Sequence, residues 1–265
     1  MTNPFDFIKA IFLGIIEGLT EFLPVSSTAH LLVSSYLIDF NSIANNLFEI
    51  VIQIGAILAI FVIYRARIFE VICNLNQKKQ QKFTLNLILA FLPAAIIGAT
   101  FHNVIKTVLF SNLVIAAALI IGGIIMIAVD YKPRKSSTHD LEKIKPLEAF
   151  AIGVFQSLAI IPGVSRSGAT IIGGMLLKLN RKTATEFSFF LAIPTIICAS
   201  LYDIYKNFDT LTFDNFEIIL VGLLSAFISA ILVIKWFINF VAHHNFVYFG
   251  IYRIIVGIII LYFAL

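Results

Sequence analysis

The sequence predicts an all-α polytopic membrane protein with six transmembrane helices and two opposed re-entrant helical hairpins, arranged as an inverted-topology repeat. Of its 265 residues, 60% are hydrophobic and only 13% are charged, about half the charged share of a typical soluble domain. So few ionisable side chains cannot form the hydrated surface that a soluble fold of this size needs. The composition therefore excludes the soluble classes of enzyme and binding domain.

Six apolar stretches are long enough to cross a hydrocarbon core of about 30 Å as helices. They are Leu47–Ile63, Thr84–Phe101, Val108–Val129, Phe187–Tyr205, Phe216–Phe237 and Phe246–Leu265. An earlier apolar stretch, Phe5–Leu23, carries Glu17 and Glu21 and is followed by no small-residue cleavage site. We therefore interpret it as part of the mature protein and not as a secretory signal.

Two further apolar regions, residues 5–38 and 147–177, are interrupted near their centres. The segment LPVSS around Pro24 breaks the first region, and IPGVSRSG around Pro162 breaks the second. The apolar arms of the second region are about 15 and 10 residues long, too short for each arm to span a bilayer. We expect both regions to be re-entrant hairpins, whose irregular backbone must be covered by protein or by a wet cavity.

Most basic residues fall on one side of this topology. Loops 64–83 and 130–146 hold five Lys or Arg each, three more follow the second hairpin, and Lys235 ends the fifth span, so 14 of 19 share a side. The positive-inside rule makes that side cytoplasmic. The other side holds few cations and the acidic residues Asp39, Asp203, Asp209 and Asp214. Both termini are then outside, and the two hairpins enter the membrane from opposite faces. The net charge of +4 implies no nucleic-acid partner, because the cations lie in short loops beside the spans.

The two hairpin regions also align with each other at an offset of 139 residues. The positions Gly14, Glu17, Ser26 and Thr28 match Gly153, Gln156, Ser165 and Ser167. Identity is low, but the matches fall on the two breaks. We expect one membrane domain, residues 1–265, made of inverted repeats 1–130 and 140–265 with a site near the bilayer midplane. Chance similarity between apolar segments is the competing explanation.

The first hairpin carries acid–base groups and hydroxyls. Glu17 and Glu21 are four residues apart, so they share a helix face, and two carboxylates at membrane depth need a proton, a cation or a metal. A hydrogen-bonded pair that ties helices together is the structural alternative. Ser26, Ser27 and Thr28 suit a helix N-cap, or one of them is a nucleophile; His30 is then a candidate acid or base. Helix N-termini also attract phosphate. 

The second hairpin carries anion-binding groups. Its glycines permit close approach of backbone to a ligand, and its hydroxyls and amides can surround an anion. Arg166 at membrane depth needs an anionic partner, which is Glu17 or Glu21 at rest or a phosphate in action. A static Arg–Glu pair is the alternative. Together the hairpins predict a site that binds phosphate and carries acid–base groups. We expect the phosphate to be bound by Ser26, Thr28, Gly163, Ser165, Ser167, Gly168 and Thr170.

The segments EGLTEFLPVSSTAH (17–30) and PGVSRSGAT (162–170) resemble the two signature motifs of the undecaprenyl-diphosphate phosphatase family, the bacitracin-resistance membrane phosphatases. The resemblance extends over the chain in length and hydropathy. It implies a hydrolase of the bacterial cytoplasmic (inner) membrane, open to the outer, periplasmic face. Such an enzyme converts undecaprenyl diphosphate to the monophosphate carrier of peptidoglycan and cell-wall synthesis, confers bacitracin resistance and depends on Mg²⁺ or Ca²⁺.

The resemblance also implies which residues act. It assigns the catalytic roles to Glu17, Glu21, Ser27, His30 and Arg166, and we take the two glutamates as the metal ligands. Two mechanisms stay open: Ser27 attacks the terminal phosphorus with Glu21 or His30 as base, or a glutamate activates water and Ser27 only binds phosphate.

Several alternatives remain at this point. A lipid or small-molecule transporter or flippase could use the same midplane site, and a structural envelope protein is a third class. The long lipid chain requires a lateral opening, whose residues the sequence does not identify. Gly122 and Gly123 could pack helices within a chain or in a homodimer. Cys73 and Cys198 show neither a disulfide framework nor metal spacing.

Overall fold

The computed structural model describes residues 4–40, 45–104, 109, 111–131, 136, 138, 140–206 and 213–263. Its helices, in chain order, are α1 (Pro4–Thr20), α2 (Ser27–Leu37), α3 (Asn45–Ile63), α4 (Arg65–Cys73), α5 (Lys78–Val104), α6 (Asn112–Asp130), η2 (Leu141–Lys143), α7 (Pro146–Ser157), η3 (Leu158–Ile160), α8 (Arg166–Leu176), α9 (Arg181–Lys206), α10 (Phe213–His243) and α11 (Val247–Phe263). Within this part of the chain the β-structure is one isolated bridge, Thr138 to Leu179. The predicted all-helical fold is confirmed.

Four of the described helices are long and apolar enough to cross a membrane. The qualifying stretches are Lys78–Thr100 of α5, Asn112–Asp130, Arg181–Lys206 and Phe216–His243 of α10. Phe48–Ile63 and Arg65–Cys73 form a pair bent by 75° that makes a fifth span if counted as one. The sixth predicted span is α11, which has only 17 described helical residues. The chain is therefore a polytopic membrane protein, with four or five spans by this measure where six were predicted.

The predicted boundaries were wrong on the basic side. Helices α5 and α9 begin at Lys78 and Arg181, ahead of the predicted Thr84 and Phe187, and residues 65–73 of the predicted loop 64–83 form α4. Hydropathy marks only the apolar part of a helix, whereas Lys, Arg and Gln are also good helix formers. The third predicted span starts late, at Asn112.

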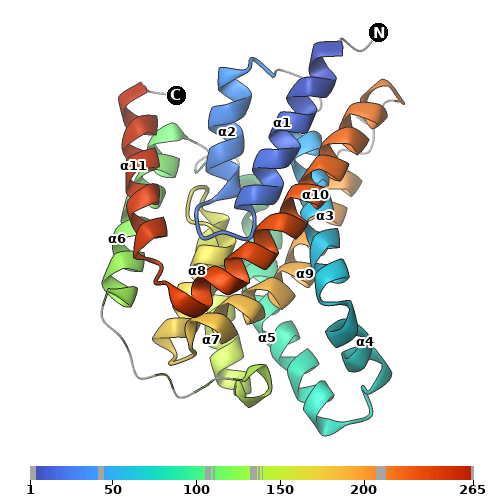
Figure 1. The fold of residues 1–265 in the computed structure, drawn as a ribbon, viewed down its shortest axis with the longest axis vertical. Coiled ribbons are helices and arrows are strands. Elements are labelled where there is room, and N and C mark those ends of the chain that lie inside the picture. The colour runs from blue at the N-terminus through green and yellow to red at the C-terminus, as the bar shows by residue number, and fades with distance from the viewer. Residues whose placement is uncertain are drawn as a thin grey trace.

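Both predicted hairpins are helix–turn–helix units. Helices α1 and α2 pack together, as do α7 and α8, while α1 packs on α10 and α7 packs on α5. The turn between α1 and α2 lies at mid-height in Figure 1, where both chain ends lie at one end of the molecule and the α4–α5 turn lies at the other. The two breaks in hydropathy thus mark real turns inside the helical body.

Two aligned glycines bring helix backbones into direct contact. A Cβ added at Gly14 of α1 would lie 2.3 Å from Gly222 O of α10, and a Cβ at Gly153 of α7 would lie 2.4 Å from Ala90 O of α5. Gly122 and Gly123 likewise pack α6 against α11 within the chain. These contacts fix each hairpin closely against a long helix.

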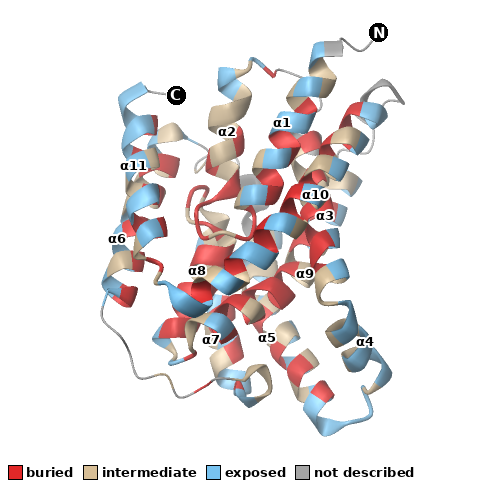
Figure 2. Cartoon of the chain, viewed as in Figure 1, coloured by how far each residue is buried: buried red, intermediate tan, exposed pale blue. Residues whose placement is uncertain are grey.

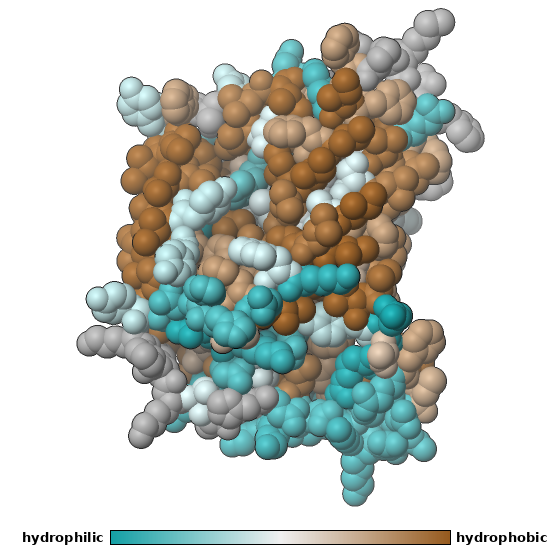
Figure 3. Space-filling model, in the orientation of Figure 1, coloured by the Kyte–Doolittle hydropathy of each residue, from teal (hydrophilic) through white to brown (hydrophobic). Residues whose placement is uncertain are grey.

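The outer surface is mainly apolar and the interior is well packed. Buried residues line the inward helix faces and the central turns (Figure 2). Large exposed hydrophobic side chains such as Ile96, Leu201 and Ile255 occur on the outside, far more than a water-soluble surface tolerates. Figure 3 shows this brown surface above a hydrophilic end that lies opposite the chain termini. The hydrophobic surface is the one that contacts lipid.

Candidate active site

The turns of the two hairpins meet through an ion pair. Arg166, the first residue of α8, donates from Nη2 to Glu21 Oε1 at 3.0 Å. The Arg166 side chain is 12% exposed and that of Glu21 is 8% exposed, so the pair is shielded from solvent. Beside it, Ser167 Oγ donates to the carbonyl of Leu23 at 2.7 Å. Of the two predicted anionic partners of Arg166, Glu17 and Glu21, the structure pairs it with Glu21.

Ser27 shares the same carboxylate. Its Oγ donates to Glu21 Oε2 at 2.5 Å, in a buried environment. A hydroxyl that gives its proton toward a carboxylate has the geometry of a nucleophile with its general base. Since Arg166 engages the other oxygen of Glu21, one carboxylate connects a hydroxyl and a cation.

Arg166 retains hydrogen-bonding capacity. Its Nη1 donates to Ser188 O at 2.9 Å, and its guanidinium carbon lies 5.9 Å from the centre of the Phe22 ring. Its Nε is buried and has no hydrogen-bond partner among the described residues. An arginine fork in a dry site matches the oxygens of a phosphate, so Arg166 is suited to hold one.

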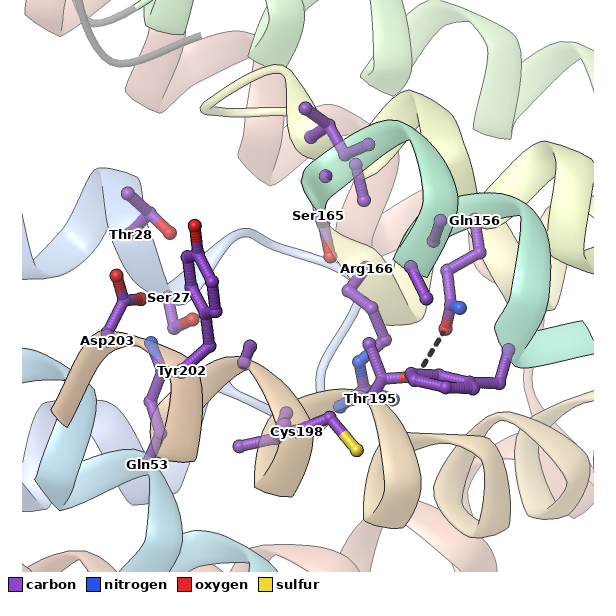
Figure 4. Close-up of a pocket in the computed structure, with 18 of the residues that line it drawn as sticks. Ser27, Thr28, Gln53, Gln156, Ser165, Arg166, Thr195, Cys198, Tyr202 and Asp203 are labelled. Atoms are coloured by element: carbon purple, nitrogen blue, oxygen red, sulfur yellow. Dashed lines mark hydrogen bonds between the residues drawn. The ribbon is translucent and has the colours of Figure 1, made fainter. Parts of the chain in front are cut away.

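A cavity of about 500 Å³ opens over these groups. Six predicted site residues line it: Glu21, Ser27, Thr28, Gly163, Ser165 and Arg166. Figure 4 shows Ser27, Thr28, Tyr202 and Asp203 toward one end, and Arg166, Thr195 and Gln156 toward the other. A volume of this order is typical of cavities that bind small molecules.

Both hairpins place a serine in a rare backbone conformation directly before their second helix. Ser26 has φ 72° and Ser165 has φ 74°, and each precedes the first residue of its helix, α2 or α8. Ser165 Oγ accepts the amide of Gly168 at 3.1 Å as an N-cap, whereas Ser26 makes no such side-chain bond. Non-glycine residues with positive φ are costly and cluster at functional sites.

The remaining predicted phosphate-binding residues lie outside the cavity lining. Thr170 Oγ1 donates to Ser188 Oγ at 2.7 Å, and Ser167 Oγ is occupied by Leu23 O. A Cβ at Gly168 would lie 3.0 Å from Arg253 Nη1. With Ser26, these residues are buried or backbone-bonded and support the turns. The structure does not bring their side chains to the cavity.

His30 also turns away from the cavity. Its Nδ1 lies 2.7 Å from Ser26 O and its Nε2 lies 2.7 Å from the Tyr252 hydroxyl, and the two rings stack at 5.6 Å. Because a carbonyl only accepts, Nδ1 carries the proton and Nε2 accepts from Tyr252. Both ring nitrogens are therefore used within the protein, and the predicted acid–base role of His30 gains no support from this geometry.

Glu17 is completely buried, and neither of its carboxylate oxygens has a hydrogen-bond partner among the described residues. The expectation that it lies on the same face as Glu21 agrees with the backbone, because the Glu21 amide donates to Glu17 O at 2.9 Å in a helical turn, although α1 itself ends at Thr20. The described residues contain no cluster of three His, Cys, Asp or Glu that could hold a metal. Magnesium, however, is commonly bound by one or two carboxylates with substrate phosphates and water. Glu17 does not line the cavity, but its buried carboxylate lies next to Glu21 and fits that donor set.

Sequence reasoning missed several site residues. The cavity also has polar groups from Gln53, Gln156, Thr195, Tyr202 and Asp203. Of these, Asp203 was considered only as an outer-side acid and Gln156 only as the repeat match of Glu17. Thr195 Oγ1 donates to Gln156 Oε1 at 3.3 Å, and Figure 4 draws this bond. Which face of an apolar span turns inward depends on packing, so the sequence offered no signal for most of them.

Arg253 is the most informative omission. It is 1% exposed and donates to four carbonyls: Pro24 O at 3.1 Å, Gly163 O at 3.0 Å, Ala118 O at 3.2 Å and Leu119 O at 3.4 Å. One side chain of α11 therefore holds the turns of both hairpins and α6. An arginine inside an apolar span was itself a signal.

A family model described as bacitracin resistance protein BacA matches residues 10–259. The chain belongs to the BacA family. It is 51% identical over 259 residues to the undecaprenyl-diphosphatase of Methylobacillus flagellatus, covering 96% of each chain. It is 52% identical over 256 residues to undecaprenyl-diphosphatase 3 of Acinetobacter baylyi, again covering 96% of each. The Bordetella avium undecaprenyl-diphosphatase is 49% identical over 269 residues, covering 96% of this chain and 95% of its own.

The BacA match, residues 10–259, includes the turns of both hairpins and every residue that lines the cavity. The predicted family is therefore confirmed, and the Ser27–Glu21–Arg166 arrangement lies inside the matched region.

Proposed function

We propose that the protein is a membrane phosphatase that hydrolyses undecaprenyl diphosphate to undecaprenyl phosphate and inorganic phosphate. The observation that carries this function is Glu21, which accepts from Ser27 on one oxygen and from Arg166 on the other inside one cavity. The relatives named undecaprenyl-diphosphatase supply the substrate class. The product would re-enter peptidoglycan and cell-wall synthesis as lipid carrier, and faster recycling would give bacitracin resistance.

In the first chemical step Ser27 Oγ transfers its proton to Glu21 and attacks the terminal phosphorus. The bond between that phosphorus and the bridging oxygen breaks, and undecaprenyl phosphate leaves. Arg166 and amides at the start of α8 stabilise the charge on the transferring group. Glu21 then returns this proton to the leaving group or to solvent. In the second step water gives a proton to Glu21 and attacks the phosphorus of the phosphoserine. The bond between phosphorus and Ser27 Oγ breaks, Ser27 Oγ takes the proton back from Glu21, and inorganic phosphate leaves. Attack by water without a phosphoserine is the alternative route.

A divalent cation fits this chemistry. Glu17 and Glu21 would hold Mg²⁺ or Ca²⁺ together with phosphate oxygens, and the ion would neutralise charge on the diphosphate. The orphaned carboxylate of Glu17 supports this assignment.

The site is proposed to open to the outer, periplasmic face of the cytoplasmic membrane. The cavity is lined by the carboxyl-terminal halves of α5 and α9, which begin at Lys78 and Arg181 on the basic side. The positive-inside rule makes that basic side cytoplasmic.

We also propose that residues 1–130 and 140–265 are inverted repeats. The matched contacts of Gly14 and Gly153 and the matched φ angles of Ser26 and Ser165 support this division. The halves have diverged chemically, since Glu21 and Ser27 align with Ile160 and Arg166. A symmetric transporter does not need that division of roles, and a transport function is not favoured.

The test is phosphate release from undecaprenyl diphosphate by purified protein in detergent, with and without EDTA, beside Arg166→Ala. We expect release by the wild type, loss with EDTA that added Mg²⁺ or Ca²⁺ restores, and loss in Arg166→Ala. No release by well-folded wild type with either metal would refute the enzyme.

A further inference from the structure

The cavity over Arg166 has a second, apolar wall. On α5 this wall comprises Phe91, Ala94, Ala95, Gly98 and Ala99, whose spacing places them on one helix face. Ala159 and Ile160 of η3 continue it, and Cys198 and Ala199 of α9 add to it. The polar groups of the hairpins and this apolar wall belong to one continuous cavity. A ligand that fills it must have a charged end and an apolar end.

Gly98 differs from every other glycine of the chain. A Cβ added at Gly98 would meet no atom within 4 Å, whereas each other glycine would bring a Cβ against a neighbouring group. Gly14 and Gly153, for comparison, allow helix backbones to touch. Glycine inside a helix costs about 0.5–1 kcal/mol relative to alanine, and at Gly98 no packing contact offsets that cost. What the missing side chain provides there is open space inside the cavity.

The apolar wall also reaches the lipid-facing surface. Ala99 on α5 and Ala199 on α9 line the cavity and are themselves exposed. Leu201, two residues beyond Ala199 on α9, is 59% exposed. An apolar chain that leaves the cavity past Ala99 and Ala199 therefore reaches the apolar outer surface of the same helices, and burial of its apolar surface there favours that path.

We propose that the first isoprene units of the substrate lie along the α5 wall, pass Gly98 and leave to the bilayer between α5 and α9. This inference rests on the proposed phosphatase function and identifies Gly98 as a specificity-determining residue for the lipid tail. The cavity of about 500 Å³ holds the diphosphate and the beginning of the tail, and the rest of the long chain stays in the membrane.

The test introduces a ring into the open space. Gly98→Phe is compared with Ile96→Phe, which adds the same side chain to the same helix on its lipid-facing side. Phosphate release is measured with undecaprenyl diphosphate and with isopentenyl diphosphate, whose single isoprene unit is too short to pass the α5 wall. We expect Gly98→Phe to lower kcat/KM for the long substrate by about tenfold or more, with Ile96→Phe close to wild type. For the short substrate the two variants should differ little.

A binding measurement makes the same test without turnover. In protein carrying Cys73→Ser, Cys198 of the α9 wall is the remaining thiol. We expect undecaprenyl phosphate to slow its reaction with a maleimide, inorganic diphosphate to leave the rate unchanged, and Gly98→Phe to remove the protection by the lipid. 

Three outcomes would overturn the proposal: full activity of Gly98→Phe on undecaprenyl diphosphate, an equal loss on both substrates, or no protection of Cys198 by the lipid. Equal loss would place residue 98 at the diphosphate end. Failure of the wild type to release phosphate from either lipid would instead contradict the proposed function, and the protection of Cys198 would still decide the tail path.

Discussion

Ser27 Oγ donates a hydrogen bond to Glu21 Oε2 at 2.5 Å, and the other oxygen of this carboxylate, Oε1, accepts one from Arg166 Nη2 at 3.0 Å. The hydroxyl and the base come from one hairpin and the cation comes from the other. The carboxylate thus orients both the group that attacks and the group that holds the phosphate.

This contact predicts the effect of Ser27→Ala. If Ser27 is the nucleophile, its removal should lower kcat by at least about a thousandfold, and a rapid quench of the wild type should trap a phosphoserine at residue 27. Thr28→Ala is the matched control, since it removes a neighbouring cavity hydroxyl that does not contact Glu21. Full turnover by Ser27→Ala would eliminate the serine mechanism and leave attack by water.

The hydrogen bonds of Arg253 predict that its substitution lowers both stability and activity, although Arg253 does not line the cavity. Lysine has the charge but not the planar fork that reaches the carbonyls of Pro24 and Gly163. We expect Arg253→Lys to lower the free energy of unfolding by about 1–3 kcal/mol and to reduce kcat more than it changes KM, because both turns lose their support. 

Thermal unfolding in detergent and steady-state kinetics measure the two effects of Arg253→Lys. Ile255→Val, at a lipid-facing position of the same helix, is the control. An unchanged kcat in a destabilised Arg253→Lys protein would show that Arg253 only stabilises the fold.

Alanine substitutions at Gly163 and at Gly98 should change the stability of the protein differently. Gly163 has φ 92°, and a Cβ there would lie 2.5 Å from Ile115 O. Gly163→Ala should therefore destabilise the protein by about 2 kcal/mol or more. Gly98→Ala, in open space within α5, should be neutral or stabilising by up to about 1 kcal/mol. Thermal unfolding of the two variants side by side checks this, and equal destabilisation would contradict the described packing.

The two native cysteines predict the orientation in the membrane. Cys198 lines the cavity and Cys73 ends α4 on the basic side; both are exposed. In intact spheroplasts a membrane-impermeant maleimide should label Cys198 and spare Cys73, and inside-out vesicles should show the reverse. Single variants Cys73→Ser and Cys198→Ser identify each signal. Labelling of Cys73 from outside would reverse the proposed orientation.

The sequence carried much of the fold and the centre of the site. Proline and polar residues that interrupt apolar segments mark both turns. A membrane-depth arginine requires an acid, so a pair of Arg166 with Glu17 or Glu21 was predictable, but only the structure identifies Glu21. The cavity residues of the long spans were not predictable from the sequence. Gln53 and Tyr202, for example, face the cavity only because α3 and α9 pack in one particular rotation. The acid–base role of His30 and a homodimer stay predictions, as do Asp209 and Asp214 as outer-side acids, because residue 209 and the side chain of 214 lie outside the described part of the chain.

The most direct test of the paired-hairpin site is a double-mutant cycle on Glu21 and Arg166. We predict that Glu21→Gln and Arg166→Ala each lower kcat/KM for undecaprenyl diphosphate by about 10²–10³, and that the double variant loses about as much as the worse single variant, because residues that act as a unit are not additive. Losses that multiply, or near-wild-type activity in either single variant, would contradict a site in which the two hairpins act together.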